Sequence, residues 1–234
     1  MNKLLVVTGG TKGIGRAIVH LFADKGFDVI TCARSEADLL VLKDEISASN
    51  PDIDLQVHHC DVTDRSSIES FISFVQTHSS RVDVLVNNAG VFLPGELANE
   101  EEGALELMLS TNLTSAYHIT RGLLPSVINS QGHIFNMCSV ASIQPYVNGG
   151  SYCISKYALY GMTKVFREEL KTKDVRVTAV LPGATHTASW EGSDLPEERF
   201  MKPDDVAHAV WGAYALSPRS VVEDLVIRPQ LGDV

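Results

Sequence analysis

Tyr152 and Lys156 place a phenol and an ammonium four residues apart, a pair suited to acid–base chemistry. On a helix, residues at this spacing lie one turn apart on the same face. A cation beside a tyrosine favours the phenolate and lowers the pKa of the hydroxyl, as a general acid or base working near neutral pH requires. The spacing alone is not specific, because Tyr160 and Lys164 repeat it.

A serine distinguishes the two pairs. Ser139 ends a predicted strand thirteen residues before Tyr152, whereas Val147, which has no hydroxyl, is at the equivalent position before Tyr160. We therefore expect Tyr152 and Lys156 to act together with Ser139. Tyr160 and its lysine are predicted to be packing and surface residues.

Asn112 is a polar residue on an otherwise apolar helix face. A buried amide costs free energy unless it is hydrogen-bonded, so Asn112 is either structural or part of a site. The apolar residues that mark this face of a long predicted helix are Leu105, Met108, Leu109, Leu113, Ala116 and Leu123.

A glycine-rich segment, Thr8-Gly9-Gly10-Thr11-Lys12-Gly13-Ile14-Gly15, follows the first predicted strand and opens the first predicted helix. Glycines permit a tight turn and a close backbone approach to a pyrophosphate, whose charge the helix N-terminus favours. This context predicts dinucleotide binding. The alternative is a glycine-rich turn without a ligand.

The end of the second predicted strand, Thr31-Cys32-Ala33-Arg34-Ser35, lacks the acidic residue that usually binds the ribose of NAD. Arg34 occupies a position suited to a 2′-phosphate, and Lys12 adds a second cation. Two cations near one dianion favour NADP(H) over NAD(H). The alternative is that both are solvated surface charges.

Strand-like and helix-like runs alternate along the whole chain. Helical periodicity marks Ile14, Ile18, Leu21 and Phe22, and again Ile68, Phe71, Ile72 and Val75. This alternation predicts an α/β fold: a Rossmann-type, doubly wound, mostly parallel seven-stranded sheet with helices on both faces. We expect one NADP(H)-binding catalytic domain over 1–234, with a substrate loop at about 183–202. The predicted strands are Lys3–Thr8, Asp28–Ala33, Asp54–His59, Asp83–Asn87, His133–Cys138, Arg176–Leu181 and Val221–Ile227.

Composition narrows the possible partners. The 234 residues carry a formal net charge of −10 without a lysine or arginine run, which argues against nucleic acid and anionic membranes as partners. Near the N-terminus the longest apolar run is Leu4–Val7, too short for a signal peptide or a membrane span. Cys32, Cys60, Cys138 and Cys153 have neither metal-site nor redox-motif spacing, so we expect reduced, buried thiols in the cytoplasm. The eight histidines form no metal motif, and we expect no catalytic metal.

Taken together, these motifs resemble the compact, single-domain form of the short-chain dehydrogenase/reductase superfamily, and the resemblance covers essentially the whole chain. It rests on a specific series of residues in a fixed order: Thr8-Gly9-x-x-x-Gly13-x-Gly15, Asp61, Asn87-Asn88-Ala89-Gly90, Asn112, Ser139, Tyr152-x-x-x-Lys156 and Pro182-Gly183.

The resemblance implies roles for the catalytic residues. Tyr152 would be the general acid in reduction, and Ser139 would orient and polarise the carbonyl. Lys156 would hold the nicotinamide ribose and lower the pKa of Tyr152, while Asn112 would support a water-linked proton relay through Lys156. Asn87 would be structural. The implied cofactor site comprises Gly9, Thr11, Lys12, Gly13, Ile14, Gly15, Arg34, Asp61, Val62, Asn88, Ala89, Gly90, Tyr152, Lys156, Pro182, Gly183 and Thr187.

Two branches of the superfamily look closest. The run from Pro182 to Trp190 and the C-terminal ending resemble bacterial sepiapterin-reductase-like proteins, and the body also resembles 3-oxoacyl-acyl-carrier-protein reductases. The expected reaction is hydride transfer from NADPH to a small polar, pterin-like ketone or a 3-oxoacyl ketone, with an acyl-carrier protein as a possible partner. Glu191 or Asp194 could offer a pterin a carboxylate. Related enzymes are commonly dimers or tetramers built through the helices holding Asn112 and Tyr152.

Two other functions stay open at this point. A catalytically idle NADP(H)-binding module could report redox state to a partner, although such a module needs no phenol–ammonium pair. The same fold could also carry out a dehydration or an epimerisation, which would consume no NADPH.

Overall fold

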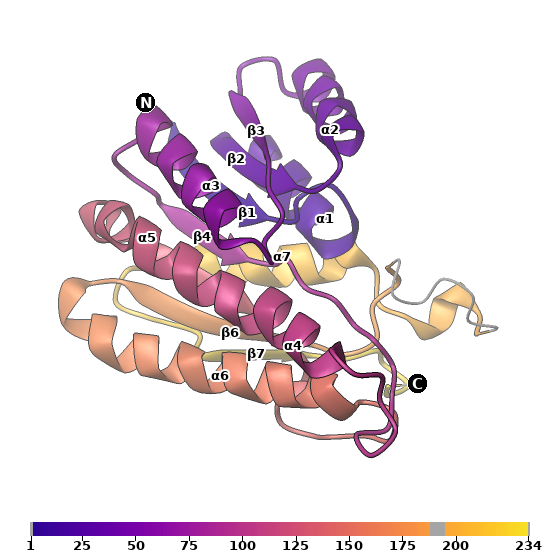
Figure 1. Ribbon diagram of the computed structural model, residues 1–234. Coiled ribbons are helices and arrows are strands. Elements are labelled where there is room, and N and C mark those ends of the chain that lie inside the picture. Colours follow the sequence, from indigo (N-terminus) through magenta and orange to yellow (C-terminus); the bar gives the residue numbers. More distant parts are fainter. Residues whose placement is uncertain (1, 188–194, 234) are drawn as a thin grey trace.

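The computed structural model describes residues 2–187 and 195–233. Within these ranges the chain forms one parallel sheet in the order β3-β2-β1-β4-β5-β6-β7 (Figure 1). Seven strands were predicted, and their parallel pairing is confirmed; the bounds of the first six agree with the prediction to within one residue. The strands are β1 (Lys3–Thr8), β2 (Phe27–Ala33), β3 (Leu55–His59), β4 (Val84–Asn87), β5 (His133–Met137), β6 (Arg176–Pro182) and β7 (Asp224–Ile227).

Helices cover both faces of the sheet, as predicted, because the inner strands are apolar on both sides. On β1, Leu5 and Val7 belong to the core that faces α1, α2 and α7, whereas Val6 belongs to the core under α3, α5 and α6. The helices on the first face are α1 (Gly13–Asp24), α2 (Glu36–Ser49) and α7 (Pro203–Tyr214); those on the second are α3 (Arg65–His78), α5 (Ser115–Ser130) and α6 (Gly150–Leu170).

The long helix predicted around Asn112 is not continuous. It consists of α4 (Ala104–Leu109), a π-helical turn η1 (Ser110–Thr114) and α5. The N–H of Ser115 closes the π turn on the carbonyl of Ser110. Asn112 lies at the centre of this turn, and such interruptions of an α-helix are frequent at functional sites.

The last strand is shorter than predicted. Its pairing with β6 begins at Ala179 and Asp224, rather than at Val221. The carbonyl of Val222 instead accepts a hydrogen bond of 2.6 Å from the hydroxyl of Thr178.

All four cysteines are buried and unpaired, as expected from the sequence. Among the described residues, no helix has both the length and the apolar character needed to cross a bilayer.

The sheet order reverses beside β1, whose neighbours are β2 and β4. In open parallel sheets, ligands bind in the crevice beyond the carboxyl ends of the strands at such a reversal. The glycine-rich segment after β1, the Asn88 loop after β4 and Ser139 after β5 all follow the carboxyl ends of strands, so the topology brings them to one edge.

Candidate active site

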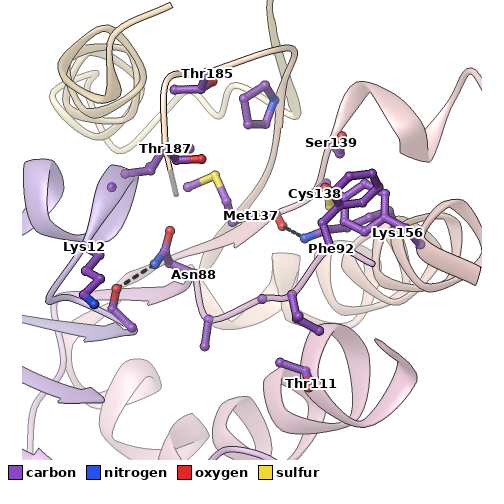
Figure 2. A pocket seen from close by; sticks show the side chains of 18 of the residues that line it. Lys12, Asn88, Phe92, Thr111, Met137, Cys138, Ser139, Lys156, Thr185 and Thr187 are labelled. Atoms are coloured by element: carbon purple, nitrogen blue, oxygen red, sulfur yellow. Dashed lines mark hydrogen bonds between the residues drawn. The ribbon is translucent and has the colours of Figure 1, made fainter. Parts of the chain in front are cut away.

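A cleft of about 1100 Å³ lies at this edge of the sheet. Lys12 and Asn88 lie at one end of it, and Ser139, Phe92 and Lys156 lie at the other (Figure 2). Small-molecule sites commonly span about 300–1,000 Å³, so a dinucleotide and a small substrate fit here together. The predicted residues that line the cleft are Gly9, Thr11, Lys12, Gly13, Ile14, Arg34, Asp61, Val62, Asn88, Ala89, Gly90, Ser139, Tyr152, Lys156, Pro182, Gly183 and Thr187.

Gly15 and Asn112 lie outside this lining. Gly15 is buried, and a Cβ at this position would stand 2.2 Å from the carbonyl oxygen of Gly9 and 2.4 Å from Nδ2 of Asn88. A glycine is therefore required at position 15, because the glycine loop and Asn88 leave no room for a side chain there.

The glycine loop has backbone conformations that favour glycine. Gly9 has φ +70° and Gly13 has φ +52°, both in the left-handed region. Helix α1 begins at Gly13, and the side chain of Lys12 does not cap it. The first-turn N–H groups of this helix are thus a suitable site for a pyrophosphate.

Asn88 fastens this loop to the end of β4. Its Nδ2 donates to the carbonyls of Thr8 (3.0 Å) and Gly9 (3.1 Å), as Figure 2 shows for part of this network. The N–H groups of Asn88 and Ala89 both donate to the hydroxyl of Thr8 at 3.0 Å. Asn87 is buried and donates to Asn136 and Thr120, consistent with the structural role predicted for it.

The two predicted phosphate-binding cations stand at the nucleotide end. The side chain of Lys12 is 71% exposed and forms an ion pair with Asp38 at 3.2 Å. Sequence reasoning missed this acidic residue at the nucleotide end. Arg34 is exposed and follows β2 directly. Asp61 accepts hydrogen bonds from the N–H and hydroxyl of Thr63, which lower its pKa, and the charge of Arg34 lowers it further.

Tyr152 lies in the first turns of α6, with its ring 4.9 Å from that of Phe92 in an edge-to-face contact. Burial raises the pKa of Tyr152 to about 12, while a hydrogen bond with the hydroxyl of Ser139 acts in the opposite direction. Ser139 lies two residues after the end of β5 and caps the short helix η2 (Val140–Ser142). The phenol is thus protonated at neutral pH and lies beside a second hydroxyl.

The lowered pKa predicted for Tyr152 is wrong, because burial of the phenol outweighs the effect of the neighbouring lysine. The lysine is only 5% exposed, and its Nζ donates to the carbonyl of Met137 at 2.7 Å (Figure 2). It stands 5.6 Å from the centre of the Tyr152 ring. Burial lowers the pKa of Lys156 itself to about 8. Desolvation of both groups therefore outweighs their attraction.

Asn112 is buried and its amide is fully engaged in hydrogen bonds. Its Oδ1 accepts from the N–H of Val91 at 2.8 Å, and its Nδ2 donates to the carbonyl of Val91 at 3.0 Å and to the hydroxyl of Ser155 at 2.9 Å. These bonds join the π turn, the loop after β4 and helix α6. A Cβ built on Gly90 would be 3.2 Å from Asn112 Oδ1 and 3.6 Å from Lys156 Nζ, so the amide and the ammonium both lie against this glycine.

The second tyrosine–lysine pair lies elsewhere, as predicted. Lys164 is exposed and lies over the ring of Tyr160 at 4.2 Å. The hydroxyl of Tyr160 donates to Asp224 at 2.7 Å, and neither residue of the pair lines the cleft.

Several residues of the cleft were missed by sequence reasoning. Asp38 lies on α2, Leu107 on α4 and Thr111 in the π turn η1. The others lie on loops or in the C-terminal tail, where no periodic pattern marks them. Trp190, Glu191 and Asp194 lie outside the described residues. The additional lining residues include Val91, Phe92, Leu107, Thr111, Gln144, Tyr146, Val147, Thr185, Arg228 and Asp233.

Among residues 2–187 and 195–233, no three or more His, Cys, Asp and Glu side chains are grouped as metal ligands would be.

Comparison with known proteins gives consistent matches along the whole chain. The family profile described as short chain dehydrogenase matches residues 3–197. Sepiapterin reductase of Chlorobaculum tepidum is 32% identical, covering 100% of this chain and 99% of the relative. The 3-oxoacyl-[acyl-carrier-protein] reductase FabG of Thermotoga maritima is 33% identical over 89% of each chain. An alcohol dehydrogenase of Thermococcus sibiricus, solved with 5-hydroxy-NADP, is 29% identical with a TM-score of 0.93, covering 100% of this chain and 99% of its own.

Proposed function

Because the chain belongs to the short-chain dehydrogenase family, we propose that it is an NADP(H)-dependent oxidoreductase that reduces the carbonyl of a small polar or 3-oxoacyl ketone. The observation that carries this proposal is the convergence of Ser139, Tyr152 and Lys156 with the glycine loop in one cleft. The archaeal alcohol dehydrogenase of the same fold, solved with an NADP derivative, supports the choice of cofactor.

The residues at the nucleotide end fit NADP(H). The left-handed glycines and the N-terminus of α1 would hold the pyrophosphate, and Arg34 and Lys12 would pair with the 2′-phosphate. Asp61 and Val62 would face the adenine, and Pro182, Gly183 and Thr187 would border the nicotinamide. When bound, the reduced nicotinamide supplies the hydride.

The chain's own residues supply the proton and the orientation. Tyr152 donates its hydroxyl proton to the carbonyl oxygen as the carbon accepts hydride, which gives an alcohol. A pKa raised to about 12 keeps this donor protonated throughout the neutral range. Ser139 hydrogen-bonds the carbonyl oxygen, and Lys156 holds the cofactor ribose. Asn112 fixes the backbone around Val91 close to Lys156, where a water-linked proton supply would end.

Replacing Tyr152 tests this role. Tyr152→Phe should lower kcat about 10²-fold or more, since general acid catalysis contributes about 10²–10⁴. NADPH binding, followed by fluorescence titration, should be retained. Tyr160→Phe is the matched control, because it removes the hydroxyl of the other Tyr-x-x-x-Lys pair outside the cleft.

The outcomes separate the competing functions. Undiminished turnover in Tyr152→Phe would exclude this tyrosine as the acid. Tight NADPH binding without turnover of a broad carbonyl panel would favour the idle binding module. Turnover without net NADPH consumption would favour a dehydratase or epimerase.

Cofactor choice is tested at Arg34. Arg34→Ala should weaken NADPH binding by about 1.5–3 kcal/mol, the usual loss for a hydrogen bond to a charged group, and leave NADH binding nearly unchanged. The measurement is the KM for each cofactor under identical conditions. Equal weakening of both would mean that Arg34 does not contact the phosphate.

Of the two substrate classes, the structure lends more support to a small polar ketone. An acyl-carrier protein is acidic and needs exposed cations near the mouth of the cleft. The sequence offers three scattered candidates, Arg121, Arg167 and Lys171. Arg167 is buried and pairs with Asp224 at 3.0 Å, Lys171 pairs with Glu168, and the exposed Arg121 donates to the hydroxyl of Tyr117.

Assembly and location are further parts of the proposal. Tyr117 on α5 and Ile154, Tyr157 and Val165 on α6 are exposed apolar residues, which a homodimer or homotetramer built through these helices would cover. Light scattering after size exclusion measures the assembly. The unpaired cysteines are compatible with the reducing cytoplasm. Residues 183–202 would form the substrate loop, whose described ends meet in a bridge between Thr185 and Met201.

A further inference from the structure

The C-terminal tail folds back onto the cleft. Strand β7 ends at Ile227, and a turn closed by the N–H of Gly232 on the carbonyl of Pro229 (2.9 Å) reverses the chain. Gly232 has φ +83°, a conformation that favours glycine. The turn therefore brings Asp233 back beside Arg228, and both line the cleft.

Asp233 packs closely on the loop after β6. A Cβ on Gly183 would stand 2.0 Å from its Oδ1, so a glycine is required at 183 for this contact. The same oxygen accepts a hydrogen bond from the N–H of Ala184 at 3.2 Å. The carboxylate thus has a fixed place at the end of the cleft bordered by Gly183.

Arg228 connects this carboxylate to the loop that follows Ser139. Its Nη1 forms an ion pair with Asp233 Oδ2, and its Nη2 donates to Oε1 of Gln144 at 3.1 Å. The side chains of Arg228 and Asp233 are 35% and 27% exposed, so the pair is accessible from the cleft. Gln144 also lines the cleft, five residues after Ser139.

At this end of the cleft Arg228, the partly exposed cation among the described lining residues, is paired with a carboxylate. Among the described lining residues near Ser139, the ionisable side chains other than Cys138 and the two phenols are Lys156, Arg228 and Asp233. Lys156 keeps its charge at neutral pH, but it is buried and donates to the carbonyl of Met137. Burial raises the pKa of the Tyr146 phenol, which stays neutral. A substrate carboxylate would need a cation whose charge is not already neutralised, whereas an amide or ester needs only hydrogen-bonding groups.

We propose that Asp233 determines substrate specificity by neutralising Arg228, so that the cleft selects ketones carrying an uncharged polar group over ketones carrying a carboxylate. This inference rests on the proposed carbonyl reduction. It deepens that function by naming the class of substrate.

The test compares two matched 3-oxo compounds, acetoacetamide and acetoacetate, by the ratio of their kcat/KM values with NADPH. The wild-type enzyme should prefer the amide. Asp233→Asn keeps an oxygen for the Ala184 N–H but releases the charge of Arg228. It should shift the ratio toward the acid about tenfold, as expected for a charge-assisted hydrogen bond.

Two further variants keep the test independent of a folding defect. Arg228→Gln should shift the ratio in the opposite direction, because it leaves the Asp233 carboxylate unpaired. The double variant should return the ratio to near the wild-type value. Asp38→Asn is the matched control: it frees Lys12 at the nucleotide end, and should alter the KM for NADPH but not the ratio between the two ketones.

A wild-type preference for acetoacetate, or an amide-to-acid ratio that stays within twofold in Asp233→Asn and Arg228→Gln, would overturn the inference while carbonyl reduction stands. An enzyme that reduces no carbonyl compound at all would instead refute the proposed function, and this inference with it.

Discussion

Burying the Lys156 ammonium lowers the free energy of unfolding at neutral pH, and the pH dependence of stability measures this cost. Its ammonium is almost fully buried, and burial lowers its pKa from an ordinary value of 10.5 to about 8. At about 1.36 kcal/mol for each pKa unit, this shift corresponds to about 3 kcal/mol. Below pH 8 the folded protein carries a charged lysine that burial disfavours, and above pH 10.5 the lysine is neutral in both folded and unfolded states.

The sign of the pH dependence follows from proton binding. Between about pH 8 and 10.5 the unfolded chain binds more protons at Lys156 than the folded chain does, so the free energy of unfolding contributed by this residue rises with pH. In Lys156→Met the contribution is absent. Between pH 7 and 10.5 the wild type should therefore gain about 3 kcal/mol in unfolding free energy relative to Lys156→Met.

Urea unfolding of both proteins at several pH values, without added cofactor, measures this difference, and other titrating groups cancel in the comparison. A difference between the two proteins that stays constant with pH would refute the reasoning. It would mean that the ammonium is solvated in the folded state.

Two other predictions concern the backbone around the site. Gly15→Ala should weaken NADPH binding and lower the unfolding free energy by about 1–3 kcal/mol, because its Cβ would clash with the carbonyl of Gly9. Gly161→Ala on α6, where a Cβ meets nothing within 4 Å, should instead stabilise the protein by about 0.5–1 kcal/mol. Urea unfolding measures the stability of the two variants. Equal changes in their unfolding free energies would contradict the packing argument. Glu100 accepts a hydrogen bond from the N–H of Ser151 at 2.7 Å, so Glu100→Ala should loosen the start of α6, cost about 1–3 kcal/mol and lower kcat. Glu100→Gln should recover part of the lost stability and part of the lost kcat. A kcat equal to the wild type in Glu100→Ala would show that this contact does not position α6.

The sheet was predictable from the sequence because its strands are buried on both faces. Continuous apolar runs such as Leu4–Val7 leave few alternatives, and alternation with helical periodicity implies parallel pairing. The boundaries were less certain at the edge of the sheet. β7 is half exposed, so its Val and Ile residues do not delimit it; the Thr178 hydroxyl donates to the carbonyl of Val222, and strand pairing begins only at Asp224.

The nucleotide end of the site was predictable because its residues are adjacent in sequence and follow a strand directly. The interruption at Asn112 was not, since a π turn leaves the apolar periodicity of α4 and α5 almost unchanged. The polar residue on that face was nevertheless the right signal, because its amide makes the hydrogen bonds that burial demands.

The pKa relation between Tyr152 and Lys156 could not be predicted from their spacing. Spacing on a helix indicates that two groups are neighbours, and neighbouring opposite charges attract. The outcome also depends on how far each group is removed from water, which is a property of the folded cleft. Here the ammonium donates to the carbonyl of Met137, and desolvation is the largest cause of the pKa shift of both groups.

The same argument applies to the substrate end. Arg228 and Gln144 are 84 residues apart, yet they meet at 3.1 Å because both follow the carboxyl ends of the sheet. Asp233 reaches them through a turn that depends on Gly232. None of these side chains has a spacing that marks it. Residues that decide specificity in this fold lie on separate loops, so one substitution can change the charge of the pocket without altering the sheet or the acid–base pair. The amide-to-acid ratio in Asp233→Asn therefore measures how far this end of the cleft determines the substrate independently of the sheet and of the acid–base pair.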